Sequence, residues 1–336
     1  MMWRYFGLML SSAFVAAALG AIAAYAAGSM VLLPTLLGWM VLLLAVVNLA
    51  GAAFFYRPLQ LHLSGGNVPR ERLEVAVRQL PLRSGLWVFS LAVVATFCYA
   101  VAAHGSWHAM AGVSPGTLAS ILVHTAVFAT YLGLYAYLLA LGFTVRVRRL
   151  LWERGEPLKP HRGRFAARLV VVVAAVALGP LSVVLADQWA DSAGPAAMGG
   201  MRADPAAMAQ MQRDMMAGMS MDQMRRSHTR YMDQSRHMDL LAALLLAGLL
   251  AYLATRGLSR SAEGLLRAMD KVDSGDLAAK APVVTDDEFG RLTERFNRML
   301  DGLNERERMR RTFRCCSPTS SALRKSPPVS RRARSW

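Results

Sequence analysis

Methionine sulfur is concentrated in one stretch of the chain, residues 198–238, which holds eleven of the twenty methionines. Several of these methionines recur at intervals of three and four residues, and one pair has the form Met-x-Met. Soft thioether sulfur favours Cu(I) or its mimic Ag(I), and imidazole is an acceptable additional ligand. We therefore predict a copper or silver site with the ligands Met211, Met215, Met219 and Met221, completed by His228 or His237.

Two other interpretations of the methionine-rich stretch stay open. Methionines at helical spacing also make a pliable apolar face that packs on partner helices or on a membrane surface, and the stretch also fits a flexible linker. It resembles the methionine-rich segments of copper-handling proteins in the bacterial envelope. The distribution of histidines favours metal, because five of the seven fall in predicted outer loops or in the outer half of a predicted span, at positions 104, 108, 124, 228 and 237.

One histidine and three cysteines are the other side chains whose chemistry could form a functional site. His124 falls inside a predicted membrane span, where an ionisable residue is a functional candidate; the simpler alternative is one hydrogen bond to a neighbouring helix. Cys98, Cys315 and Cys316 show neither metal-ligand spacing nor a disulfide framework. The cysteines therefore predict no site.

The elements that must position these residues are membrane helices. Hydrophobic residues make up 54% of the 336 residues and the mean hydropathy is +0.31, yet the formal charge is +16. This combination excludes an ordinary soluble domain and indicates spans joined by basic loops, so no nucleic-acid partner is needed to explain the arginines. Six apolar runs are long enough, or nearly so, to cross a bilayer: residues 7–27, 31–55, 86–103, 117–143, 166–185 and 240–254.

The basic loops predict the orientation of these spans. Five arginines lie between the second and third runs, and six arginines and a lysine between the fourth and fifth, so both connections should be cytoplasmic. The connection at residues 104–116 has no Lys or Arg, as expected outside. Residues 188–237 then form an outer loop, and both termini lie in the cytoplasm of a bacterium, with the chain in the inner membrane.

Residues 255–307 read as two short amphipathic helices joined by a structured connector. In each helix the apolar residues step by three and four, the a/d pattern of a coiled coil. The glycine of Gly275-Asp276-Leu277 stops the first helix, and Glu288, in an acidic run, suits the start of the second. The predicted core consists of Leu258, Leu265, Met269, Val272, Phe289, Leu292, Phe296, Met299 and Leu303.

This stretch resembles a HAMP domain, the signal-relay module beneath many bacterial transmembrane sensors. The matching residues are Gly275-Asp276-Leu277, the turn Asp287-Glu288-Phe289-Gly290, and Phe296-Asn297-Arg298-Met299. The resemblance implies a homodimer whose four helices share one parallel coiled-coil core, because two-heptad helices are marginal alone. One departure is Ala262, which stands where the family usually has a proline. An ordinary juxtamembrane coiled coil is the alternative.

Residues 308–313 continue the second helix with an arginine-rich sequence ending in Thr-Phe. It resembles the linker that enters the catalytic domain of six-span class III adenylate cyclases. Residues 314–336 contain neither a cyclase domain nor a kinase phosphoacceptor motif, and they read as a basic disordered tail, which we interpret as a product of a shifted reading frame. A basic tail lying on anionic lipid is the alternative.

Together these patterns predict an all-α protein with a six-span membrane region at residues 1–254 and a cytoplasmic HAMP dimer at 255–307. We expect it to relay an envelope or membrane stimulus toward an adenylate cyclase output, with no catalytic activity in this chain and with full-length cyclase relatives as possible partners. A histidine kinase or chemotaxis-type sensor fragment is one alternative. A copper-handling membrane protein or small transporter of the envelope is another.

Overall fold

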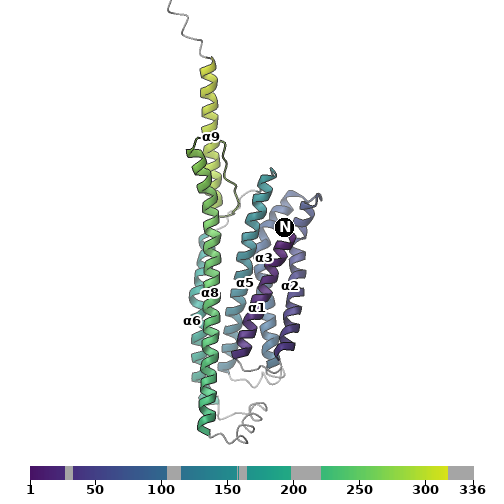
Figure 1. Ribbon diagram of the computed structural model, residues 1–336, viewed down its shortest axis with the longest axis vertical. Helices are drawn as coiled ribbons and strands as arrows, with labels where there is room; N and C mark the ends of the chain where they lie inside the picture. The colour runs from purple at the N-terminus through teal and green to yellow at the C-terminus, as the bar shows by residue number, and fades with distance from the viewer. Residues whose placement is uncertain (27–32, 104–114, 157, 159–164, 198–220, 317–336) are drawn as a thin grey trace, which may run out of the picture.

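Helices are the only regular secondary structure among the residues that the structure describes, which confirms the predicted all-α fold class. The computed structural model describes residues 1–26, 33–103, 115–156, 158, 165–197 and 221–316. Long helices run side by side through a bundle, and one further helix projects beyond one end of it (Figure 1). These helices are α1 (Met2–Ala26), α2 (Leu33–Leu63), α3 (Arg70–Ala103), α5 (Pro115–Glu153), α6 (Phe165–Ala197), α8 (Met221–Asp273) and α9 (Glu288–Cys316).

Several of these helices are long and apolar enough to cross a membrane. By length and composition, five segments qualify within the described residues: Leu42–Leu63, Arg70–Cys98, Leu118–Glu153, Ala166–Ala186 and Leu240–Asp273. They correspond to the last five of the six predicted spans. The first predicted span falls in α1, which packs along α2, α5 and α8 in the same bundle.

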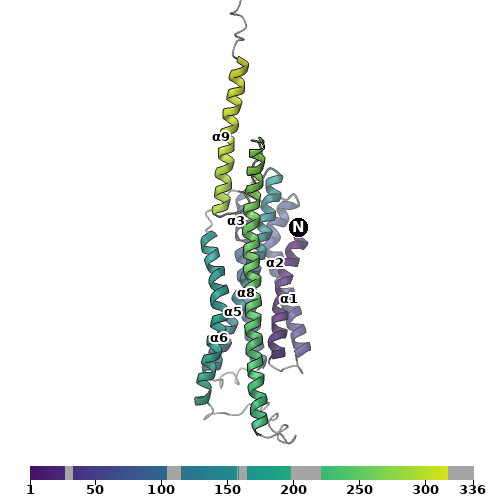
Figure 2. The same ribbon diagram turned by 60° about the vertical axis from the view of Figure 1, so that its left-hand side comes forward.

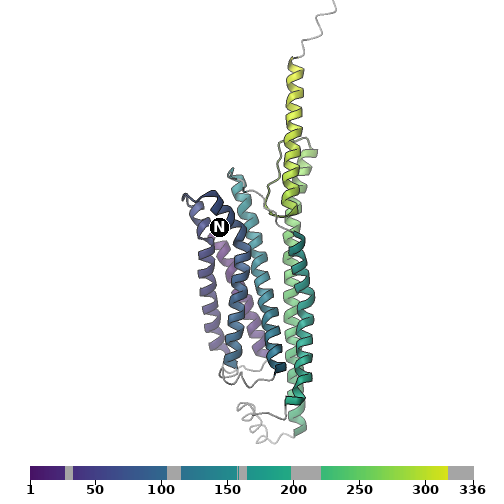
Figure 3. The ribbon, with the colours of Figure 1, turned by 180° about the vertical axis from the view of Figure 1, so that it is seen from behind.

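The N-terminus lies at the same end of the bundle as α9, and so do the α2–α3 connection, the end of α5 and the start of α6 (Figures 1 and 3). The predicted positions of both termini relative to the spans require this arrangement. Which side of a membrane this end faces stays a prediction from the basic residues.

Two helices extend well beyond the predicted spans, so many of the basic residues assigned to loops are helical. α3 begins at Arg70 rather than near residue 86, because Leu73, Val77 and Leu80 recur at helical spacing and are buried in the core of the bundle. α5 likewise continues to Glu153.

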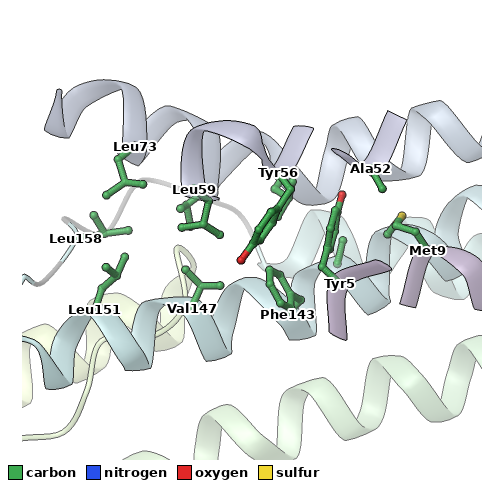
Figure 4. Packing of buried hydrophobic residues seen from close by; sticks show 13 residues of the cluster. Tyr5, Met9, Ala52, Tyr56, Leu59, Leu73, Phe143, Val147, Leu151 and Leu158 are labelled. Carbon is green, nitrogen blue, oxygen red and sulfur yellow. The ribbon is translucent and has the colours of Figure 1, made fainter. Parts of the chain in front are cut away.

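Aromatic side chains fill the core near the end of the bundle from which α9 projects (Figure 4). The ring of Tyr5 stacks on Tyr56 with centroids 5.6 Å apart and lies 5.2 Å from the ring of Phe143. The Tyr5 hydroxyl and Ser84 Oγ are 2.8 Å apart, which satisfies both groups where no water reaches them. Side chains of α1, α2, α3 and α5 thereby form one packed unit.

Glycines let α5 lie close to its neighbours. A Cβ on Gly85 of α3 would be 3.0 Å from the carbonyl oxygen of Gly133 on α5. Between α5 and α6, the Tyr131 hydroxyl donates a hydrogen bond of 3.0 Å to the Ala175 carbonyl. Gly179 makes room for this hydroxyl, because a Cβ there would lie 1.9 Å from it. In lipid the hydrophobic effect does not drive helices together. Small residues at such crossings let the helices approach closely, and van der Waals packing then holds them together.

α8 carries the last membrane span and the first predicted HAMP helix as one helix of 53 residues, about 80 Å long at 1.5 Å per residue. It passes Ala262 without interruption, where a proline would remove a backbone hydrogen bond. α6 extends to Ala197 and α8 begins at Met221, so both ends of the predicted loop at residues 188–237 are helical. α8 therefore joins the far end of the bundle directly to the relay region.

Candidate signal-transfer site at the bundle end

A glycine ends α8 and begins the connector to α9. Gly275 has a φ of +96°, a left-handed conformation that glycine adopts without strain. The amide of Gly275 donates to the Val272 carbonyl and the amide of Asp276 to the Lys271 carbonyl, at 2.9 and 3.0 Å. This is the paired hydrogen bonding of a glycine-type helix stop. Gly275 thus lies at the position that the sequence predicts for the break.

Two asparagines of α9 hold the connector against that helix. The Asn297 side chain accepts a hydrogen bond from the Ala281 amide (2.9 Å) and donates one to the Ala281 carbonyl (2.8 Å). The Asn304 side chain donates to the Leu277 carbonyl at 2.6 Å. Since the connector is neither helix nor strand, side chains supply the partners that its backbone would otherwise lack. The connector is therefore an ordered segment that hydrogen bonds fix to α9.

The start of α9 depends on Asp287 and Gly290. Asp287 Oδ1 accepts hydrogen bonds from the amides of Phe289 (3.1 Å) and Gly290 (3.3 Å), as an N-cap residue does. A Cβ on Gly290 would lie only 2.0 Å from the Thr285 carbonyl oxygen. Glu288 is exposed and pairs with Arg291 at 3.1 Å. The turn thus requires an acceptor at residue 287 and a missing side chain at residue 290.

Two arginines of the membrane bundle contact this same turn. Arg148, near the end of α5, donates a 2.5 Å hydrogen bond to Asp286, and both side chains are largely buried. Arg168, in the first turn of α6, lies 3.8 Å from the N-cap carboxylate of Asp287. Figure 2 shows the beginning of α9 next to the beginning of α6. The first turn of α9 is therefore attached electrostatically to two membrane helices that precede α8.

The predicted core residues divide into two groups in the single chain. Leu265 and Phe296 are buried, together with Ala268, Ala281 and Leu300, and Val272 packs against them. Phe289 is half-buried, and the Leu258 side chain lies outside the described residues. Met269, Leu292, Met299 and Leu303 are exposed. On α9 the face toward α8 and the connector is turned by roughly a quarter turn from the predicted seam, because Asn297 must face the connector.

The side chains of all six predicted metal ligands lie outside the described part of the structure. Met211, Met215 and Met219 lie outside the described residues. Met221, His228 and His237 belong to α8, whose backbone alone is described there. Among the described side chains, no three of His, Cys, Asp and Glu gather into a metal-binding group.

His124 makes a bond inside its own helix. Its Nδ1 lies 2.8 Å from the Ser120 carbonyl oxygen, one turn earlier in α5. This contact fits the simpler structural role, with the difference that the partner belongs to α5 itself rather than to a neighbouring helix.

Comparison with known proteins bears on the region that contains this junction. Residues 253–305 match the HAMP domain family. A segment of 71 residues is 34% identical to the signal transduction histidine-protein kinase BaeS of Escherichia coli (strain K12), and it covers 21% of this chain and 15% of that kinase. No solved structure matches. The chain is thus a multi-pass membrane protein of signal transduction with a HAMP domain beside its last span.

Sequence reasoning identified the caps of the HAMP helices but not their attachment to the bundle. Arg148 was counted as a loop charge, and Arg168 was treated only as part of an apolar run. The acidic pair Asp286-Asp287 and the arginine in the first turn of a span, Arg168, are visible in the sequence, but nothing local assigns one to the other. The asparagine bridge from Asn297 left no local signal beyond its place in the Phe-Asn-Arg-Met motif.

Proposed function

We propose that the chain relays an envelope or membrane stimulus through its HAMP domain to an adenylate cyclase output joined to α9. The observation that carries the proposal is the double attachment of the HAMP domain. Its first helix is a direct continuation of the last span, whereas its second helix is tied to α5 and α6 through Asp286 and Asp287. A shift of α8 against α5 and α6 then changes how the two HAMP helices meet.

The relay works as a homodimer in this proposal. Leu292, Met299 and Leu303 form an exposed apolar stripe on α9, and Met269 and Leu266 lie exposed on α8. Parallel coiled coils bury such stripes against a second copy of the same helix. The single chain leaves them facing solvent, which supports pairing of two chains through these five residues.

The inner membrane of a bacterium, with both termini in the cytoplasm, is the proposed location. The arginines and lysines gathered at the HAMP-side end of the bundle support this orientation. The methionine-rich stretch then lies on the outer side, since α6 ends and α8 begins at the end of the bundle opposite α9 (Figure 1). Cu(I) or Ag(I) bound there is the proposed stimulus, and its support is the density of thioether ligands.

A histidine kinase output is the second candidate, and the identity with the BaeS segment favours it. Support for the cyclase comes from the resemblance of the arginine-rich end of α9 to a cyclase linker. Both outputs attach to the same helix, so the relay proposed above is common to them.

Chimeras distinguish the two outputs and test the relay. Residues 1–313 are fused in frame to a class III cyclase domain or to the catalytic part of a histidine kinase, each with Asp286→Asn and with Glu305→Gln as the matched control. Glu305 is an exposed carboxylate of α9. We expect Asp286→Asn to change cyclic AMP formation several-fold and Glu305→Gln to leave it unchanged. Equal activity of the two variants contradicts the relay, whereas regulation of the kinase fusion alone selects the second candidate.

A further inference from the structure

A cavity of about 640 Å³ opens where the membrane helices meet the HAMP domain. Its walls come mainly from α3, α5, α6, α8 and the connector, with one residue each from α1 and α9. Most of the lining is apolar and includes Leu138, Leu169, Val172, Val173, Val176 and Leu253. Guanidinium groups line the part nearest the connector. The cavity thus combines an apolar body with a cationic end, which suits an amphiphilic ligand with a negatively charged head.

The cationic end contains a buried hydrogen-bond donor without an acceptor. Arg148 is 6% exposed, and its Nη2 bonds to Asp286, but its buried Nη1 has no hydrogen-bond partner. Leaving a buried donor of a charged group unsatisfied is costly, so natural proteins rarely do it without a ligand or an ion nearby. Arg148 lines the cavity, so an anionic acceptor bound at this end would satisfy its guanidinium once the side chains that cover Nη1 move aside.

The charge balance of the lining agrees with an anion. Five arginines line the cavity, at positions 78, 146, 148, 168 and 256, against the two aspartates Asp286 and Asp287. The lining therefore carries three more positive than negative charges. The two aspartates neutralise part of this positive charge, and the charge that remains suits a phosphate with one negative charge.

The position of the cavity along the bundle selects a membrane lipid as the source of that phosphate. Arg168 lies in the first turn of α6, and Arg256 follows the apolar part of α8 by two residues, so both mark the HAMP-side limit of the apolar spans. Lipid headgroups lie at this level, and basic pockets between membrane helices on the cytoplasmic side bind them. Leu169 and Val173, on the cavity wall, are also 42% and 55% exposed, so an acyl chain reaches the cavity from the bilayer.

We propose that this cavity binds one anionic phospholipid of the adjoining leaflet. Its phosphate accepts hydrogen bonds from Arg148 Nη1 and from the Arg168 guanidinium, and one acyl chain lies along Leu169 and Val173 of α6. Because Asp286 occupies Nη2, the lipid and Asp286 share the Arg148 guanidinium without displacing each other. The lipid therefore strengthens the attachment of α9 to the bundle. The assignment concerns binding alone and is independent of the output proposed above.

The test measures lipid retained by the full chain. The 336-residue protein is purified in detergent, exchanged into mixed vesicles of phosphatidylglycerol and phosphatidylcholine, re-extracted and examined by native mass spectrometry. We expect one phosphatidylglycerol per chain in preference to phosphatidylcholine. Arg148→Gln removes the donor and should weaken retention about tenfold or more, since hydrogen bonds to charged groups are the strong ones. Arg149→Gln, an exposed neighbour outside the cavity, should retain the lipid.

A second pair of variants separates lipid binding from folding. Val173→Trp fills the acyl part of the cavity at an exposed position, and Val170→Trp adds the same bulk at an exposed α6 position outside the cavity. Loss of phosphatidylglycerol in the first and retention in the second supports the proposal. Equal retention of both lipids, or unchanged binding in Val173→Trp, overturns it. Displacement of the lipid by millimolar inorganic phosphate together with unchanged binding in Val173→Trp assigns a free-anion site instead.

Discussion

Arg148 at the end of α5 donates a hydrogen bond to Asp286, 138 residues later in the chain. Asp286 precedes the N-cap of α9 by one residue, so this bond attaches the start of the second HAMP helix to a membrane helix other than the last span. In the proposed relay, movement of the last span reaches the first HAMP helix along α8, whereas the second HAMP helix follows α5. The difference between the two movements is the signal that the relay transmits.

Breaking this bond should loosen the start of α9. Asp286→Asn leaves the Arg148 charge buried with a weaker acceptor, and removing one partner of a buried ion pair costs about 3–5 kcal/mol. We expect faster amide hydrogen exchange at Phe289 and Gly290, whose amides the adjoining Asp287 caps. Glu305→Gln is the control on the same helix. Unchanged exchange in the Asp286 variant would show that Asp287 holds the turn without help from α5.

Gly290 should not tolerate a side chain. In Gly290→Ala the new Cβ meets the Thr285 carbonyl oxygen, a backbone atom that moves only with the connector. We expect displacement of the turn and loss of several degrees in the melting temperature of the HAMP region. Gly302→Ala is a matched control, because nothing lies within 4 Å of its Cβ in the middle of α9. That control should gain up to about 1 kcal/mol of helix stability, and an equal loss in both variants argues against a close approach at residue 290.

Local chemistry explains which of these features the sequence predicts. Gly275 needs a left-handed conformation, and Asp287 caps a helix through its own neighbours, so both are visible in a few residues. The bond between Arg148 and Asp286 is not, because no local pattern distinguishes this arginine from the others at the same end of the bundle. Topology alone brings the two together.

The inward face of α9 shows the same limit. The a/d pattern predicts Leu292, Met299 and Leu303 as core, yet the single chain buries Leu300 instead. Asn297 decides the rotation of the helix, because its amide must reach both the amide and the carbonyl of Ala281. The pattern of hydrophobic residues does not show this hydrogen-bonding requirement. The exposed part of the predicted seam on α9, Leu292, Met299 and Leu303, is buried only if a second chain covers it.

Cross-linking tests this pairing. In a chain whose three native cysteines are replaced by serine, we expect Met299→Cys and Leu303→Cys, both on the exposed apolar stripe, to form disulfide-linked dimers in membranes under mild oxidation. The Cα atoms of a disulfide lie within about 4.4–6.8 Å, so only residues near the dimer axis qualify. Arg298→Cys, on the polar side of the same turn, should stay monomeric. Equal cross-linking at positions 298 and 299 would indicate random collision instead of a defined interface.

A negative charge on the exposed apolar stripe of α9 should prevent the two chains from pairing. Met299→Asp places a carboxylate in the proposed dimer core, where burial of an unpaired charge is strongly unfavourable. We expect the chains to separate on sizing columns while the membrane bundle remains folded. Asp at position 298 is the matched control, since Arg298 is exposed in the single chain. A dimer that survives Met299→Asp places the pairing surface elsewhere.

The methionine-rich stretch should bind Cu(I) through Met211, Met215, Met219 and Met221, with His228 or His237 completing the site. Leucine has a similar volume to methionine, and exchanging them usually costs less than about 1.5 kcal/mol, so a stretch used only for packing tolerates four such exchanges. A metal site does not, because leucine has no donor atom. Competition titration of the full chain with a Cu(I) chelator should therefore show at least tenfold weaker binding in the four-leucine variant. Leucine at Met201, Met208, Met216 and Met224 removes as many sulfur atoms from the same stretch and should have a smaller effect. Equal binding by the native chain and the first variant leaves only the packing role.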